Sequence, residues 1–428
     1  MSSTPWPAVP YHVGGAVSDD LRFADRKELL YTLRTLAADP DREGFILSGP
    51  RRYGKSSVLE RFARIIGTEA CVVRLNVLAI LGYADVWPAG TVVPTMLRTL
   101  LDVLEADLGT LPSRCRELAE YPRFEVEKFR REALPDLISL VAPRRLVVLI
   151  DEMEVAQELD LMAPVELVSA LLPLPGSRGL KTFLGIIWGR PFGRGLSRNV
   201  PSRLKDFHRK ELKRFTASEV GEALRQPVHG AYDWSEETIE RVWKLTVGHP
   251  LFVASVGAAV HARRYAGVTE NVSVAEVDAA LKDALGHAES WEDAWGQLNI
   301  RQQILLRAIA EEPGANIDRV VSIAQGWNAP YDRADFEPFT RSLHDDGLIA
   351  EGDSGFVFQV PMIRSWIHRF TPTQILNAPE NPRDGFVAEA VRKEQEGRRL
   401  YEAGQLNEAA LAFQAALELD ATRWWAAA

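Results

Sequence analysis

Cysteine is scarce in this chain of 428 residues, which contains only Cys71 and Cys115. A chain of this length that relied on disulfides would contain more, so the sequence predicts a reducing compartment, and we expect a cytoplasmic protein. The first ten residues lack a basic stretch followed by an apolar one, which argues against a secretory signal. Long hydrophobic runs are also missing, because residues 146–150 fall far short of the roughly 20 residues that span a bilayer. No association with a membrane is expected.

Positive charge is not in excess either. Lys and Arg number 50 against 59 Asp and Glu, which gives a formal net charge of −9. This balance argues against a protein whose main task is to coat nucleic acid or anionic lipid. Apolar residues make up 46% and charged residues 25%, as in ordinary globular proteins, so most of the chain should fold. Its length predicts about two to four domains.

Apolar segments alternate with helical patterns in the first half of the chain. Strands are expected at residues 44–48, 71–77, 145–150 and 182–188, and helices at residues 23–38, 55–66, 92–108 and 124–141. Strands that are apolar along their whole length are typical of a parallel sheet covered by helices on both faces. The sequence therefore predicts an α/β domain.

Residues 49–56 read GPRRYGKS and fit the pattern G-x-x-x-x-G-K-[ST], with a strand before and a helix after. In this pattern backbone amides wrap a phosphate, Lys55 reaches the β- and γ-phosphates, and the Ser56 hydroxyl binds Mg²⁺. The α/β domain is therefore predicted to be a P-loop NTPase domain. No N-K-x-D or T-K-x-D sequence is present to read guanine, so the expected cofactors are ATP or ADP with Mg²⁺. The predicted nucleotide contacts in this loop are Gly49, Pro50, Arg51, Arg52, Tyr53, Gly54, Lys55, Ser56 and Ser57.

An acidic pair and an arginine complete the predicted site. Asp151 ends an apolar strand and is expected to bind Mg²⁺ together with Ser56, while Glu152 would polarise the attacking water. Arg190 follows another apolar strand, where a γ-phosphate contact would lie. The predicted catalytic residues are thus Lys55, Glu152 and Arg190. The alternatives are an ordinary polar loop start for the acidic pair and a solvated loop arginine for Arg190.

Residues 190–214 are rich in positive charge, with nine Arg or Lys against Asp206 and Glu211. This stretch would supply an arginine finger to a neighbouring molecule, contact nucleic acid, or form a solvated basic face. The residues alone leave these three readings open.

Helical patterns dominate after the α/β domain. Three short helices and a β-hairpin with its turn at residues 352–355 form the outline of a winged helix, and a Pro- and Asn-containing linker follows. Gly397, Gly404, Ala409, Phe413 and Ala416 fit one tetratricopeptide (TPR) helix pair. A lone repeat does not bury its own face, so the chain would continue past Ala428 or the pair would pack on something else. The predicted domains are 1–211 (P-loop core), 212–290 (helical lid), 291–371 (winged helix), 372–387 (linker) and 388–428 (TPR-like helix pair).

The would-be DNA-reading segment, residues 331–346, is acidic. It has only Arg333 and Arg341 as cations, and phosphate-contacting helices are rarely so acidic. The acidic charge therefore argues against DNA as a partner, and a structural role is favoured. The acidic residues of this segment are Asp332, Asp335, Glu337, Asp345 and Asp346.

This order of parts resembles the STAND class of AAA+-related P-loop ATPases (signal-transduction ATPases with numerous domains). Residues 49–57 look like the G-P-R-R-x-G-K-[ST]-S loop of prokaryotic members. Residues 23–28 (FADRKE) are similar to the family's F-x-G-R-E element, with Asp25 at the glycine position. Residues 248–250 (GHP) look like its G-x-P element, which is also a helix-capping glycine followed by a proline.

The resemblance implies that Val13 approaches the adenine and that Pro250 lies over the base. It implies a switch that rests with ADP, receives a protein signal or effector through its C-terminal repeats, exchanges ADP for ATP and forms homo-oligomers. Many members act in bacterial regulation or antiviral defence. The rival functions are a winged-helix DNA-binding regulator and a remodelling motor with fast turnover.

Overall fold

The computed structural model describes most of the chain in two compact units. The core unit comprises residues 16–18 and 26–213, and the helical unit comprises residues 1–15, 19–25 and 214–428. Each unit is described by itself. The described residues are 10–13, 17, 23, 26–50, 52–82, 88, 90–159, 162–174, 182–189, 204, 206–264, 270–286, 292, 295–296, 298–377, 393, 396–397, 399–401 and 405–419.

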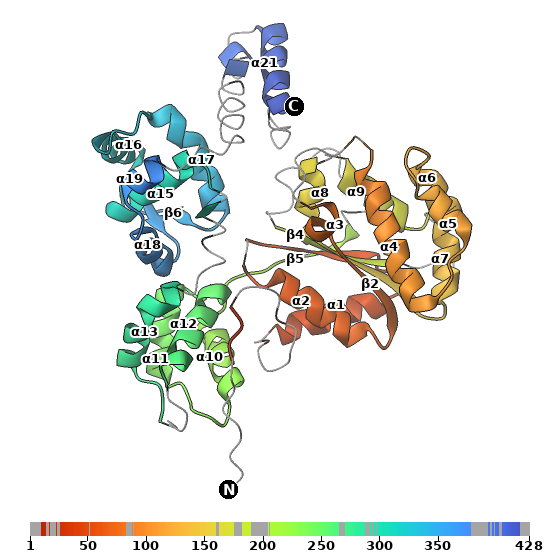
Figure 1. Ribbon diagram of the computed structural model, residues 1–428, viewed down its shortest axis with the longest axis horizontal. Coiled ribbons are helices and arrows are strands. Elements are labelled where there is room, and N and C mark those ends of the chain that lie inside the picture. Colours follow the sequence, from red (N-terminus) through yellow and green to blue (C-terminus); the bar gives the residue numbers. More distant parts are fainter. Residues whose placement is uncertain are drawn as a thin grey trace. The chain divides into compact units, whose positions relative to one another are not determined.

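A five-stranded parallel sheet forms the centre of the core unit (Figure 1). Its strand order is β2-β3-β4-β1-β5, so β4 lies between β1 and β3. Four strands lie where the apolar runs predict them. The strands are β1 (Gly44–Ser48), β2 (Ala70–Asn76), β3 (Arg145–Asp151), β4 (Thr182–Trp188) and β5 (His208–Glu211).

Helices cover both faces of this sheet (Figure 1). One face carries α1 (Lys27–Ala38) and α2 (Lys55–Ile66), and its packing includes an edge-to-face contact of Phe45 with Phe62 at 5.4 Å between ring centroids. The parallel sheet between two helical layers confirms the predicted α/β class. The opposite side holds α3 (Val77–Leu81), α4 (Val92–Leu108), α5 (Ser113–Leu118), α6 (Val126–Lys128), a π-helical turn (Phe129–Ala133), α7 (Leu134–Val141), α8 (Met153–Leu159) and α9 (Ala163–Leu171).

The edge strand β5 is the one strand of this sheet that the sequence patterns do not predict. Its sequence, HRKE, has no apolar residue, and three of its four residues are exposed. It pairs with β1 alone. An edge strand needs little apolar surface because solvent covers its outer side, so hydrophobic periodicity carries no signal for it.

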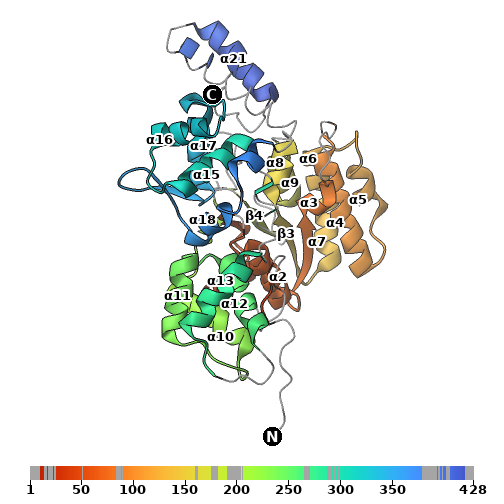
Figure 2. The same cartoon turned by 60° about the vertical axis from the view of Figure 1, so that its left-hand side comes forward.

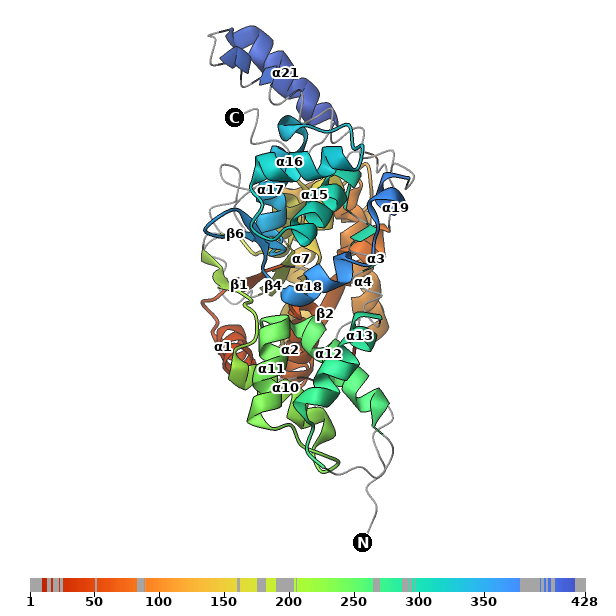
Figure 3. The same ribbon diagram turned by 90° about the vertical axis from the view of Figure 1, so that its left-hand side faces the viewer.

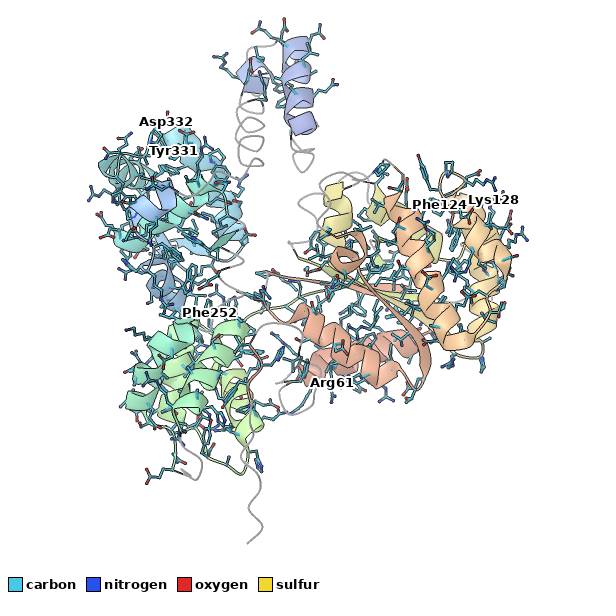
Figure 4. All side chains as sticks on the ribbon, viewed as in Figure 1. Arg61, Phe124, Lys128, Phe252, Tyr331 and Asp332 are labelled. Carbon is cyan, nitrogen blue, oxygen red and sulfur yellow. The ribbon has the colours of Figure 1, made fainter. Side chains whose placement is uncertain are left out.

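The first part of the helical unit consists of α10 (Ala217–Arg225), α11 (Glu236–Thr246), α12 (Pro250–Arg263) and α13 (Val274–Gly286) (Figures 2 and 3). These helices pack around buried Trp234 and Phe252, the latter marked in Figure 4. Capping-box hydrogen bonds between Thr216 and Glu219 begin α10, as their spacing predicts.

Tyr11 joins the N-terminal segment to this helical core. Its side chain is 4% exposed, and its hydroxyl donates a hydrogen bond to the Leu224 carbonyl at 2.7 Å. The indole N–H of Trp234 donates to the same hydroxyl oxygen at 3.0 Å. A Cβ atom on Gly257 would approach the Tyr11 ring to 2.7 Å, so only glycine leaves room there. The predicted division placed this segment with residues 1–211, whereas its ring packs among the helices that follow residue 213.

The second part of the helical unit has the three predicted helices (Figure 2) and, after them, the predicted hairpin. Strands β6 and β7 pair in antiparallel fashion, and Trp366 of the next helix is fully buried. The elements are α15 (Ile300–Glu311), α16 (Ile317–Gly326), α17 (Arg333–Asp345), β6 (Ile349–Glu351), β7 (Phe356–Phe358), α18 (Pro361–Ile367) and α19 (Pro372–Leu376).

The start of the expected linker is helical. Pro372 occupies the first position of α19, and a capping box between Thr371 and Gln374 fixes that end. Ile375 is buried in the helical unit, so proline starts a helix here instead of preventing one. Further along, α21 (Leu406–Leu419) carries Phe413, and a Cβ on Gly397 would approach its ring to 2.7 Å. The TPR-like interpretation of this segment stays a prediction.

Candidate nucleotide-binding site

The predicted phosphate loop connects β1 to α2 in the core unit. Gly54 ends the loop with φ 81°, and a Cβ there would meet no atom within 4 Å, so the loop is open on that side. Gly49 has φ 145°, and a Cβ there would lie 3.0 Å from the Leu212 carbonyl oxygen. Glycine is thus required by backbone conformation at both positions and by close packing at Gly49.

Lys55 is the first residue of α2 and is 8% exposed. Its ammonium Nζ donates hydrogen bonds to the carbonyl oxygens of Gly49 and Pro50, both at 2.8 Å. The positive charge therefore lies inside the loop, at the N-terminal end of a helix whose dipole also attracts anions.

Asp151 ends β3 and is 9% exposed. Burial raises the pKa of its carboxyl group. The Ser56 side chain and the Glu152 amide act in the opposite direction and lower that pKa. The charges of Lys55 and Arg74 also act to lower that pKa. The structure thus brings together the hydroxyl and the carboxylate that the sequence predicts as metal ligands.

A hydroxyl and a carboxylate suit Mg²⁺, which binds proteins through one or two side chains and completes its shell with water and phosphate oxygens. A metal site built from protein side chains alone is not found in the described part of the chain, because no group of three His, Cys, Asp or Glu side chains there could hold a metal ion. Ser56 and Asp151 would hold the cation, which supplies positive charge next to the β- and γ-phosphates when bound.

Glu152 follows Asp151 directly and has an unusual backbone conformation. Its φ is 59°, and its amide N–H donates to Oδ1 of Asp151 at 2.9 Å. A non-glycine residue in the left-handed region costs about 1 kcal/mol or more, and Val247 at the end of α11 has the same feature. The role of Glu152 in hydrolysis stays a prediction.

The end of β4 lies between the phosphate loop and the acidic pair. Ser48 pairs with Trp188, and Ile150 pairs with Ile186, so β4 ends between these two motifs. The amide of the next residue, Gly189, donates to Oε2 of Glu154 at 2.8 Å. The sequence patterns did not single out Glu154, because an acidic residue in the first turn of a helix is common.

Other predicted residues lie elsewhere or are not described. Arg51, Arg190 and much of the basic stretch 190–214 lie outside the described residues. Val13 and Pro250 belong to the helical unit, so their expected nucleotide contacts stay predictions. Within the phosphate loop, Tyr53 is buried and Arg52 has φ 65°. The Ser57 hydroxyl accepts a hydrogen bond from the Val17 amide at 3.0 Å.

The G-x-P element joins α11 to α12. Gly248 has φ 69°, and a Cβ there would lie 1.9 Å from the Phe215 carbonyl oxygen. Its own carbonyl accepts from the Phe215 amide at 2.8 Å. Pro250 then begins α12, as proline commonly does at a first helical position. Between them, His249 is buried, and burial lowers its pKa to about 3, with a smaller contribution from the charge of Arg214.

We expect His249 to make the helical unit sensitive to acid. Its pKa is lower in the fold than in the unfolded chain, so the stability of the neutral form is present above about pH 6.5 and is lost as the pH falls toward 3. Linkage gives a loss of about 2 kcal/mol between pH 7 and pH 5. Urea unfolding of wild type and His249→Gln at both pH values measures it. The variant should lose less stability between the two pH values, whereas His229→Gln, an exposed control, should match wild type. Equal losses in all three proteins would contradict the prediction.

The described part of the chain contains no helix that is long and apolar enough to cross a membrane.

Comparison with known proteins identifies the fold. No protein-family model matches the chain, and neither does any curated protein. Among solved structures, the Walker-type ATPase PABY2304 of Pyrococcus abyssi is similar with a TM-score of 0.58 and 15% identity, over 83% of this chain and 98% of that chain. The ORC2 protein of Aeropyrum pernix, in ADPNP–ADP complexes, is similar with a TM-score of 0.54 and 14% identity, over 82% of this chain and 93% of that chain. The chain has the fold of AAA+-type P-loop ATPases.

Proposed function

We propose that this protein is a slow ATPase that works as a nucleotide-dependent switch. One observation carries the proposal: the Lys55 ammonium lies inside the phosphate loop, and the Ser56 side chain lies close enough to the Asp151 carboxyl group to lower its pKa. In P-loop NTPases the lysine ammonium contacts the phosphates, and the serine hydroxyl and a carboxylate at a strand end hold Mg²⁺. Lys55, Ser56 and Asp151 have this arrangement. The ORC2 relative, solved with ADPNP and ADP, supports an adenine nucleotide.

The connection between the two units supports a switch. Leu212 belongs to the core unit, where its amide donates to the Ser48 carbonyl at 2.8 Å and its carbonyl packs against Gly49. Phe215, three residues later, donates to Gly248 of the helical unit. Leu212, which packs against the first residue of the phosphate loop, is therefore only two residues before Arg214, where the helical unit continues. A movement of the loop could pass to the helical unit along this short stretch of backbone.

The resemblance to STAND ATPases suggests how such a switch would be used. A signal or effector protein would act through residues 388–428, and nucleotide exchange would drive opening and formation of homo-oligomers, in bacterial regulation or defence. Tyr401, Leu406 and Leu411 are exposed apolar residues in that segment, which supports a protein-binding role for it.

The charge around α17 disfavours DNA reading. Arg333 pairs with Asp318 and Glu337, so its charge is already balanced by carboxylates. Asp332, which caps α17, and Tyr331 lie at its start (Figure 4). An acidic helix in which one of the two arginines is paired with acids is poorly suited to contact phosphates.

Bound nucleotide and turnover test the proposal and separate it from a motor. We expect ADP or ATP to be released when the purified protein is denatured, and a turnover far below the roughly 1 s⁻¹ at which typical enzymes begin. Chromatography of the released nucleotide and a phosphate-release assay with ATP and Mg²⁺ measure both. Turnover of many ATP per second would favour a remodelling motor. Absence of ATP and ADP binding at millimolar nucleotide with Mg²⁺ would overturn the proposal.

A further inference from the structure

A carboxylate outside the predicted motifs lies at the end of the central strand. Glu154 is in the first turn of α8, three residues after Asp151. One of its oxygens, Oε2, accepts the hydrogen bond from the Gly189 amide at 2.8 Å. The contact joins the helix that follows the acidic pair to the residue that follows β4.

Gly189 occupies a sensitive position in the sheet. Its neighbour Trp188 pairs with Ser48, the last residue before the phosphate loop, and β4 also pairs with β3, which carries Asp151. Gly189 is the first residue after that strand, and Arg190 follows it in the sequence. The direction of the main chain at Gly189 therefore determines the path of the backbone as it leaves β4, between the phosphate loop and the Asp151–Glu152 pair.

Close packing supports a specific contact at this point. A Cβ atom on Gly189 would lie 1.9 Å from Oε1 and 2.7 Å from Cδ of Glu154. No side chain fits there without displacing the carboxylate. The carboxylate accepts the amide in a charge-assisted hydrogen bond, which is stronger than a bond between neutral groups.

We propose that Glu154 is a positioning residue for ATP hydrolysis, which holds the Gly189 amide and so fixes the main chain where β4 ends beside the phosphate loop. The proposal rests on the proposed ATPase function. Glu154 acts through the backbone of Gly189 and is distinct from Glu152, the expected base. Because catalysis depends on geometry to within about 1 Å, loss of this contact should lower kcat about tenfold to a hundredfold.

Turnover and nucleotide affinity of Glu154→Ala and Glu154→Gln test the role. We expect Glu154→Ala to lose about tenfold or more in kcat with a Kd for ATP within about threefold of wild type, which separates geometry from binding. The amide oxygen of glutamine still accepts the Gly189 N–H, so Glu154→Gln should recover most of the lost turnover. Glu117→Ala, which removes an exposed carboxylate on α5, is the matched control. Circular dichroism and the melting temperature report on folding.

A second substitution tests the contact itself. Gly189→Ala places a methyl group against the Glu154 carboxylate, and removal of that carboxylate makes room for it. Gly189→Ala should therefore lower kcat more in the wild-type background than in the Glu154→Ala background. Equal losses in both backgrounds, or a Glu154→Ala enzyme with wild-type turnover, would overturn the inference. If wild type itself neither binds nor hydrolyses ATP, the proposed function fails and the inference fails with it.

Discussion

Lys55→Ala is expected to abolish measurable binding of ATP and ADP. The ammonium group lies inside the phosphate loop, at the start of α2. Charge-assisted hydrogen bonds are worth about 1.5–3 kcal/mol each, so the loss of two such bonds to phosphate costs at least about 3 kcal/mol. That energy corresponds to at least about a hundredfold in Kd. Isothermal titration of nucleotide-free protein with ATP and Mg²⁺ measures the change.

Arg64→Ala is the matched control for Lys55→Ala. It removes a cation from the last turn of the same helix, where the exposed side chain pairs with Glu60. Nucleotide affinity should stay at the wild-type value in this variant. Unchanged ATP affinity in a correctly folded Lys55→Ala protein would contradict the assignment of the loop, and circular dichroism checks the fold.

Glu152→Gln is expected to retain ATP and lose hydrolysis. Glutamine has the shape of glutamate but does not take a proton from the attacking water, and general-base catalysis contributes about 10²–10⁴ in rate. The left-handed backbone at position 152 is available to both residues at similar cost, so the site should keep its shape. Single-turnover hydrolysis with excess protein, together with the Kd for ATP, separates the two effects.

The control for this prediction is Glu117→Gln, which makes the same chemical change on exposed α5. Its turnover should match wild type. A Glu152→Gln protein with wild-type turnover would show that another group polarises the water.

Much of the core unit was predictable because its strands are buried on both faces. Such strands are continuous apolar runs, and β1, β3 and β4 lie where those runs predict them. Strand β5 has no such run, and its place in the sheet depends on pairing with β1. Residues 372–376 were expected in a linker because proline breaks the interior of a helix, whereas Pro372 occupies the first helical position, where its missing N–H costs nothing.

The candidate site divides in the same way. Lys55, Ser56 and Asp151 follow from local motifs, because phosphate and Mg²⁺ chemistry requires those groups at those spacings. The contact of Glu154 with Gly189 joins residues 35 positions apart and depends on the order of strands in the sheet. The bond from Val17 to Ser57 is likewise tertiary. No local pattern predicts such contacts.

The burial of Tyr11 means that the two units are interleaved along the polypeptide. A protease cut between Lys213 and Arg214 would release two fragments, yet the first would still supply an aromatic ring to the interior of the second. The fragment 214–428 made alone would leave the Trp234 indole N–H without its acceptor, at a cost of about 1–3 kcal/mol. The fragment 1–213 made alone would carry the same ring exposed to water. Reassembly of the nicked protein would thus require the insertion of the Tyr11 side chain into the second fragment.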